Sequence, residues 1–199
     1  MQALAAAIVR PGAITLEVGR ALTRSGRANA KIKQRVFVCD EAAKLPTLIQ
    51  LLEDGLDDDA RMIIFASSKR RADELTRALR GDGWPALCLH GDKTQEEREW
   101  VLHEFKEGRQ PLLIATDVAQ RGLDIKDVRC VINFDSPASG EAYVHRIGRS
   151  GRAGSDGSAC TLLTPDDARV AVELVRVLRG SNQDVPEALE ALAAGFRKK

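Results

Sequence analysis

The stretch from Tyr143 to Gly154, YVHRIGRSGRAG, holds three arginines and three glycines in twelve residues and contains no acidic residue. Arg146, Arg149 and Arg152 recur at every third position, and a guanidinium group offers a planar fork that matches phosphate oxygens. Glycines beside them permit close approach of another backbone or of a ligand. The stretch is not a dinucleotide-binding fingerprint, because its glycines step by three and it does not join a strand to a helix. It predicts a phosphate-facing site, with a solvated basic patch as the alternative.

The segment ASSKRRADEL (66–75) follows the apolar run MIIF (62–65). Either Ser67 or Ser68 can cap a helix that starts here. Lys69 and the two arginines after it would lie in the first turn, where the helix dipole disfavours cations. A bound anion would reverse this penalty, whereas the aspartate and glutamate further along would partly offset it in a solvated basic turn. The segment alone leaves both interpretations open.

The segment GDKTQEER follows the run ALCLH and starts at Gly91. Gly91 exposes backbone amides next to a helix N-terminus, which is a natural phosphate site. Gln95 and Arg98 are three residues apart and would share a helix face near that end. Thr94 and Glu97 fit a capping box, and a capped helix needs no ligand.

The segment TDVAQRGLDI follows the run LLIA and starts at Thr116. Thr116 and Asp117 come directly after the expected strand, and Gly122 and Asp124 lie in the next turn. Hydroxyl, carboxylate and glycine at this place suit phosphate and ribose contacts, but they also suit ordinary turn chemistry.

Six short apolar runs alternate with segments of helical period from residue 35 onward. The runs are RVFVC (35–39), MIIF (62–65), ALCLH (86–90), LLIAT (112–116), CVINF (130–134) and SACTLLT (158–164). Runs that are apolar throughout indicate a sheet covered on both faces, and repeated strand–helix units indicate mostly parallel strands. The sequence therefore predicts an α/β three-layer domain, in which ligands bind outside the carboxyl ends of the strands.

Helix boundaries are also marked in the sequence. Thr94 and Glu97 predict the start of one helix, and Pro165 suits the first turn of the helix after the last strand. RGDG (80–83) predicts a helix stop before the third run.

The composition of the chain limits the class of protein to which it can belong. With 199 residues, 44% of them hydrophobic and 30% charged, global disorder is excluded. The net charge is only +1, so any nucleic-acid contact must come from a local cluster.

Four cysteines without zinc spacing predict buried free thiols in a reducing compartment. No apolar stretch approaches the ~20 residues of a membrane span, and the N-terminal ALAAAIV lacks the basic start of a signal peptide, so we expect an intracellular chain.

The chain divides into three parts on composition. Residues 1–34 are expected to be a linker with the tail of a preceding domain, because Pro11 and Gly12 break the first apolar segment and the rest is basic and aperiodic. Residues 35–180 form the α/β domain. Residues 181–199 are expected to add one short helix and a basic tail.

Four motifs in order resemble the second RecA-like domain of DEAD-box RNA helicases. They are FASSK, HGDKTQEER, ATDVAQRGLDI and HRIGRSGR, and the resemblance covers about residues 35–191. The text between the motifs is similar to the nuclear subfamily that acts in transcription, splicing and ribosome assembly. MQALAAAIV resembles the closing helix of the family's first domain, which suggests an excised fragment.

The resemblance assigns roles to residues of this sequence. It implies that Arg149 and Arg152 are arginine fingers for the γ-phosphate, that His145 couples the nucleotide and RNA sites, and that Gly122 and Asp124 meet the ATP ribose. The implied contacts to the RNA backbone are Ser68, Lys69, Gly91, Gln95, Arg98, Thr116 and Asp117. Two positions depart from the family pattern: Ser68 stands where threonine is usual and Gln120 where serine is usual, and neither change removes a charge.

The sequence lacks two parts of a nucleotide hydrolase. It contains no G-x-x-x-x-G-K-[ST] loop for a triphosphate and no DEAD stretch for magnesium. In the family that this chain resembles, ATP and Mg²⁺ are held mainly by the N-terminal RecA-like domain, which is therefore the expected partner together with RNA. We expect a monomeric, nuclear or cytoplasmic motor domain that is inactive alone. The alternatives are an autonomous sequence-nonspecific RNA-binding module and an interaction scaffold on a helicase fold.

Overall fold

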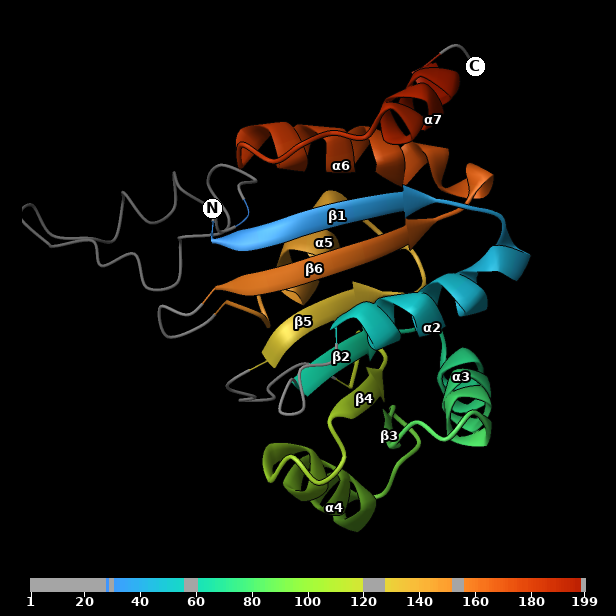
Figure 1. The fold of residues 1–199 in the computed structure, drawn as a ribbon, viewed down its shortest axis with the longest axis vertical. Helices are drawn as coiled ribbons and strands as arrows, with labels where there is room; N and C mark the ends of the chain where they lie inside the picture. The colour runs from blue at the N-terminus through green and yellow to red at the C-terminus, as the bar shows by residue number, and fades with distance from the viewer. Residues whose placement is uncertain (1–27, 29–30, 56–60, 120–127, 152–155, 198–199) are drawn as a thin grey trace, which may run out of the picture.

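The described part of the chain forms one parallel sheet (Figure 1). The computed structural model describes residues 28, 31–55, 61–119, 128–151 and 156–197. Its strands are β1 (Ile32–Val38), β2 (Arg61–Phe65), β3 (Ala86–Leu89), β4 (Leu112–Ala115), β5 (Val128–Asn133) and β6 (Gly157–Leu163). They lie in the order β1-β6-β5-β2-β4-β3, and every neighbouring pair is parallel.

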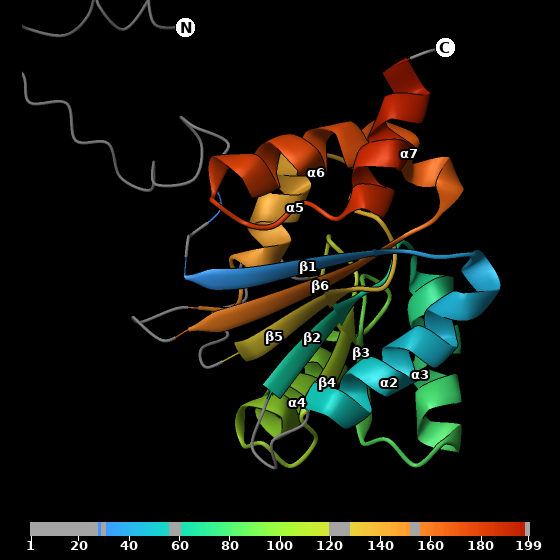
Figure 2. The ribbon, with the colours of Figure 1, turned by 45° about the horizontal axis from the view of Figure 1, so that its top comes forward.

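Helices cover both faces of this sheet. They are α2 (Lys44–Gly55), α3 (Lys69–Gly81), α4 (Gln95–Lys106), α5 (Gly140–Ile147), α6 (Ala168–Gly180) and α7 (Glu187–Arg197), with short 3-10 helices η1 (Glu41–Ala43) and η2 (Pro165–Asp167). Figures 1 and 2 show α2 on one side of the sheet and α5 and α6 on the other.

Three apolar cores hold these layers together. Helices α2 and α3 pack on one face, against side chains such as Met62 and Ile64. On the opposite face, Val101 and Phe105 of α4 pack against β2, β3 and β4, while α5, α6 and α7 pack over β1 and β6. The predicted three-layer α/β architecture is confirmed.

Each predicted apolar run contains a strand, but the first strand starts earlier than expected. β1 begins at Ile32, which pairs with Gly157, and not at residue 35. In this edge strand Ile32 and Gln34 are buried, whereas Lys33 and Arg35 are exposed. An alternating pattern is what one covered face produces, so a search for continuously apolar runs missed the first residues.

The helix boundaries follow the sequence signals. Thr94 and Glu97 form a capping box at the start of α4, and Pro165 lies in the first turn of η2, directly before α6. Helix α3 ends at Gly81, and Gly83 then adopts a left-handed φ of 89°. These three predictions are confirmed.

The C-terminal helix α7 packs against α6 and β1, and Leu189 and Ala193 are buried in the same core as Ile32. The division of the chain at residues 34 and 180 stays a prediction.

The four cysteines are free thiols, of which Cys88, Cys130 and Cys160 are buried and Cys39 is half-buried. Among the described residues, no helix is long and apolar enough to cross a membrane.

Candidate functional site

Three neighbouring strands bring the candidate RNA-contact residues to one edge of the sheet. β2, β4 and β3 are adjacent in that order, and each is followed directly by a candidate segment. Ser68 and Lys69 follow β2, Thr116 and Asp117 follow β4, and Gly91, Gln95 and Arg98 follow β3. Since parallel strands end on the same edge, these residues form a row along the carboxyl edge. We call it the carboxyl-edge row.

Ser68 is the residue that caps α3. Its Oγ accepts a hydrogen bond from the backbone N of Arg71 at 3.2 Å. Ser67, the alternative cap, instead donates its hydroxyl to Asp135 Oδ2 at 2.9 Å. The two serines therefore have different roles: Ser68 caps the start of α3, and Ser67 binds the buried carboxylate of Asp135.

Each cation in the first turn of α3 has a carboxylate partner within the domain. Exposed Lys69 pairs with Asp92 at 2.6 Å, and its ammonium holds the pKa of Asp92 below the ordinary value. Glu74 offsets the positive charge of this turn by pairing with Arg70, as expected. Asp73 does not pair with these cations and instead accepts a hydrogen bond from His90 Nε2 at 3.1 Å. The other two pairs are Arg70–Glu74 (2.8 Å) and Arg71–Glu41. Exposed pairs contribute little to stability, so Lys69 can exchange its carboxylate partner for a phosphate at small cost.

The start of α4 is capped internally, and Gly91 before it has open space around it. Thr94 Oγ1 accepts from Glu97 N at 3.2 Å, while Thr94 N donates to Glu97 Oε2 at 2.7 Å. Gly91 is exposed, shows no left-handed φ, and a Cβ built on it would meet no atom within 4 Å. Nothing within the described structure therefore requires glycine at this position.

Gln95 and Arg98 point to different partners. Gln95 Nε2 donates to Glu99 Oε1 at 2.6 Å on the exposed side of α4. Arg98 donates through an Nη atom to the carbonyl oxygen of Ala119 at 3.3 Å. Arg98 thus ties α4 to the segment after β4, where buried Thr116 donates its backbone N to Leu89 O at 3.3 Å.

Arg146 is a buried arginine whose role was not predicted from the sequence. Its Nε and an Nη atom donate to the two carboxylate oxygens of Asp117, at 2.7 and 2.6 Å. Its other Nη atom donates to Asn133 Oδ1 at 3.2 Å and to Asp135 O at 2.9 Å. The guanidinium carbon lies 5.0 Å from the centre of the Phe65 ring. The first arginine of the triplet therefore holds the ends of β4 and β5 together, with its guanidinium group directed at partners inside the domain.

A helical signal could have revealed this. Tyr143, Val144 and Ile147 are the buried apolar residues of α5, and position 146 lies on the same side of a helix. The candidate carboxylate of Asp117 is thus engaged inside the domain, and its contact to RNA stays a prediction.

Asp135 is a second buried polar residue that sequence reasoning missed. Its carboxylate accepts from Ser67 N and Oγ, both at 2.9 Å, and from Lys44 Nζ at 3.2 Å. Burial raises the pKa of Asp135, but the hydrogen bonds from Ser67 and the Lys44 ammonium outweigh burial, so the pKa is lowered. The carboxylate joins the segments after β2 and β5 to the start of α2.

We expect Asp135→Asn to lower the free energy of unfolding at pH 7 by about 1–3 kcal/mol, because the buried Lys44 ammonium would keep only the exposed Glu41 as a charge partner. The folded pKa lies below the ordinary aspartate value of about 3.9, so this stabilisation is complete above that value and lost as pH falls through the folded pKa. Urea unfolding of both proteins at pH 7 and near pH 3 tests this. A difference in unfolding free energy that stays constant across both pH values would contradict it.

The loop after α5 explains part of the glycine content of the opening stretch. Gly151 has a left-handed φ of 63°. A Cβ on Gly157, at the start of β6, would lie 2.5 Å from Gly151 N and 2.8 Å from Ser150 Oγ. Two backbone segments approach closely here, and only glycine fits at residue 157. Close approach of another backbone was one of the two roles, beside approach of a ligand, that the sequence allowed for glycines in this region.

Arg149 lies toward the opposite edge of the sheet from the carboxyl-edge row. Ser150 forms a parallel bridge with Val128, the first residue of β5, so the loop reaches the amino end of that strand. His145 is exposed on α5, whereas Arg149 is half-buried. The expectation that sites follow strands therefore applies to the row but not to Arg149. Arg152, Gly122, Asp124 and Gln120 lie outside the described residues.

The all-parallel sheet with helices on both faces has the α/β architecture of a RecA-like domain, and the motifs at its edges suit phosphates. The chain belongs to the helicase conserved C-terminal domain family, whose sequence model matches residues 43–154.

Curated relatives of the chain are DEAD-box RNA helicases. It is 54% identical over 159 residues to the probable ATP-dependent RNA helicase DDX17 of Homo sapiens, covering 79% of this chain and 22% of that protein. It is 51% identical over 166 residues to DEAD-box ATP-dependent RNA helicase 20 of Arabidopsis thaliana, covering 83% of this chain and 33% of that protein. The chain thus spans a third or less of the length of these relatives.

Solved structures agree with this assignment. The E. coli DEAD-box protein SrmB, solved bound to regulator of ribonuclease activity A, matches with a TM-score of 0.67 and 37% identity, over 79% of this chain and 93% of that one. The C-terminal domain of the DEAD-box protein Dbp5 matches with a TM-score of 0.66 and 36% identity, over 75% and 85% of the two chains.

Proposed function

We propose that this chain is the second motor domain of an ATP-dependent DEAD-box RNA helicase. In this role it binds the RNA sugar-phosphate backbone along the carboxyl-edge row and supplies Arg149 and Arg152 to ATP held by an N-terminal RecA-like domain. The observation that supports the proposal most is the row itself, since three separate motifs converge on the adjacent strands β2, β4 and β3.

The row is suited to phosphates more than to bases. Helices α3 and α4 both begin there, so the positive ends of two helix dipoles and their first-turn amides lie on the same edge. Contacts to phosphate fix position but carry no sequence information. We therefore expect RNA binding without sequence preference, with a slope in log salt of roughly −0.7 per phosphate contact to a single strand.

The arginines at the other end of α5 would stabilise charge that develops on a transferring phosphoryl group. His145 lies one turn before Arg149, close enough for a group bound at one to affect the other. In the described part of the chain, one cluster of side chains could hold a metal ion, and it consists of Asp73, Cys88 and His90. Mg²⁺ prefers oxygen ligands, so this cluster does not suit it.

An autonomous RNA-binding module or a scaffold would keep the row but would have no use for the arginine pair. Hydrolysis of ATP with and without the N-terminal domain separates these functions from a motor domain. The compartment, nuclear or cytoplasmic, and the monomeric state stay predictions.

The test of RNA binding uses Gly91, which the domain itself does not require. We expect Gly91→Val to leave the melting temperature unchanged but to weaken binding of oligouridine by about tenfold, since a side chain there would hold the phosphates away from the amides. The matched control is Gly195→Val on α7, where a Cβ also meets no atom within 4 Å. Wild-type affinity of a folded Gly91→Val protein would remove Gly91 from the interface.

A further inference from the structure

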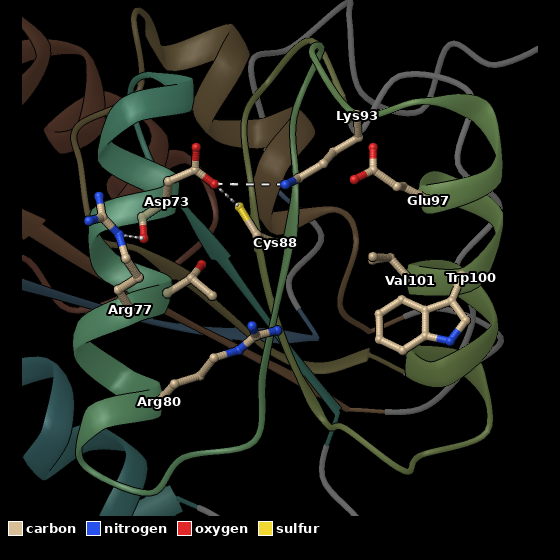
Figure 3. A pocket seen from close by; sticks show the side chains of 9 residues that line it. Asp73, Arg77, Arg80, Cys88, Lys93, Glu97, Trp100 and Val101 are labelled. Carbon is tan, nitrogen blue, oxygen red and sulfur yellow. Dashed lines mark hydrogen bonds and ion pairs between the residues drawn. The ribbon is translucent and has the colours of Figure 1, made fainter.

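A second surface lies between α3 and α4, beside the edge strand β3. It is a cavity of about 460 Å³ whose walls include Arg77 and Arg80 from α3 and Glu97, Trp100 and Val101 from α4. We call it the α3–α4 groove. Figure 3 shows Arg80 extending from α3 into the groove, with Trp100 on the opposite wall and Cys88 between them.

The arginines of the groove differ from the other arginines of α3. Arg70 and Arg71 each pair with a carboxylate. Exposed Arg77 and Arg80 donate through Nε only to backbone oxygens, Asp73 O at 3.3 Å and Ala86 O at 2.7 Å. Within the described part of the chain neither forms an ion pair with a carboxylate, and the nearby Glu74, which the charge of Arg77 also reaches, is already paired with Arg70. The two guanidinium groups at this surface remain available to an anion.

The acidic side chains that line the groove already have partners. Asp73 Oδ1 accepts from His90 Nε2 at 3.1 Å and lies 3.9 Å from Lys93 Nζ. Glu97 accepts from the backbone of Thr94 in the capping box. Neither carboxylate is placed to neutralise Arg77 or Arg80.

Trp100 supplies an apolar contact at the same place. Its side chain is 53% exposed, and it is one of only three large hydrophobic residues exposed in the described structure. Buried Cys88 and Val101 line the groove beside it. A large exposed aromatic next to an open apolar surface is typical of a binding site.

We propose that the α3–α4 groove binds a short acidic segment of a partner protein, with an apolar side chain against Trp100 and carboxylates at Arg77 and Arg80. The two arginines lie one helical turn apart, about 5–6 Å at Cβ, and alternate side chains of an extended peptide are about 6.6 Å apart. Acidic residues at alternate positions of the peptide therefore match the spacing of the Arg77 and Arg80 guanidinium groups. Arg80 Nε already donates to Ala86 O on the edge strand, and the contacts of this proposal are made by side chains of the peptide rather than by strand addition.

The charges of α4 favour a peptide over RNA here. Exposed Glu96 and Glu97 precede Trp100 by one turn, so a base stacked on Trp100 would bring its phosphates beside two carboxylates. A peptide can place a neutral or basic residue at that point. The groove is thus distinct in chemistry from the carboxyl-edge row, and the proposal does not depend on RNA binding there.

Selection from a random peptide library displayed on phage tests this without assuming a sequence. The library is panned in parallel against the 199-residue chain, against Arg77→Glu and against Trp100→Ala. We expect the chain to enrich peptides with acidic residues next to apolar ones. Synthetic copies should bind each variant at least about tenfold more weakly. Arg176→Glu, an exposed arginine of α6, is the matched control and should bind them like the wild type.

A second readout uses the fluorescence of Trp100 in a Trp84→Phe background, which leaves it as the one tryptophan. The enriched peptides should change its emission, and melting temperatures should show that all variants are folded. Three results would overturn the proposal. The chain could enrich peptides that lack acidic residues, the synthetic peptides could bind Arg77→Glu as tightly as the wild type, or the wild type could enrich no more peptides than Arg77→Glu does. Oligouridine that changes the emission and displaces the peptides would assign the groove to RNA instead.

Discussion

Replacing Arg149 with alanine, in a protein that joins this chain to its N-terminal RecA-like domain, is expected to slow ATP hydrolysis by about 10³–10⁵-fold, or roughly 4–7 kcal/mol. The reason is loss of a planar cation that meets charge formed in the transition state. Arg149→Lys should restore little, because an ammonium group cannot reproduce the two-pronged geometry. Single-turnover hydrolysis at saturating ATP measures the effect on the chemical step.

The fold should survive this change. Arg149 is half-buried in a loop after α5 and is not a member of the three apolar cores, so we expect only a small shift in melting temperature. The chain alone should hydrolyse no ATP, with or without RNA. If the folded Arg149→Ala protein hydrolysed ATP at the wild-type rate, the arginine-finger role would be wrong and the stretch would be a basic patch.

Arg146→Ala should show the opposite behaviour, with a large loss of stability. Removing one partner of a buried ion pair costs about 3–5 kcal/mol. The lower end applies here because the Asp117 side chain is 37% exposed and can regain water. Each kcal/mol corresponds to a fall of about 2–4 °C in melting temperature for a domain of this size. The loss arises because Asn133 Oδ1 and Asp135 O would remain buried without their donor.

A double-mutant cycle with Asp117 separates the ion pair from the other contacts. Arg146→Met combined with Asp117→Leu should cost less than the sum of the single changes, because neither charge is then left alone. Arg176→Ala, on the surface of α6, is the control and should shift stability by no more than about 0.5 kcal/mol. A melting temperature of Arg146→Ala equal to that of the control would show that the buried network contributes nothing.

The fold was predictable because its signals are local. Continuous apolar runs identified the strands that are covered on both faces, and caps such as Thr94 identified helix starts from neighbouring residues. β1 was the exception, because an edge strand with one open face alternates at Lys33 and Arg35. The strand order was not predicted, since pairing of residues far apart in the sequence leaves no local pattern.

The candidate site was predicted in part. Its motifs were found because hydroxyls, glycines and cations directly follow apolar runs, and the structure brings those on β2, β3 and β4 together. Arg146 and Asp135 were missed because their partners are distant in the sequence, and an arginine in a basic motif suggests a ligand rather than a buried ion pair. The α3–α4 groove depends on the spacing between two helices and could not be seen from either one alone.

The position of β1 has a consequence for how the chain is made. Among the described strands β1 has β6 as its single neighbour, and contacts between these two strands join residues 125 positions apart in the sequence. Ribosomes add about 5–20 residues per second, so the first strand emerges on the order of ten seconds before its partner exists. During that interval Ile32 and Val36 have no core to enter, and a nascent chain that stops before Gly157 would leave them without one. The helices and strands between them can assemble first, and β1 completes the sheet last.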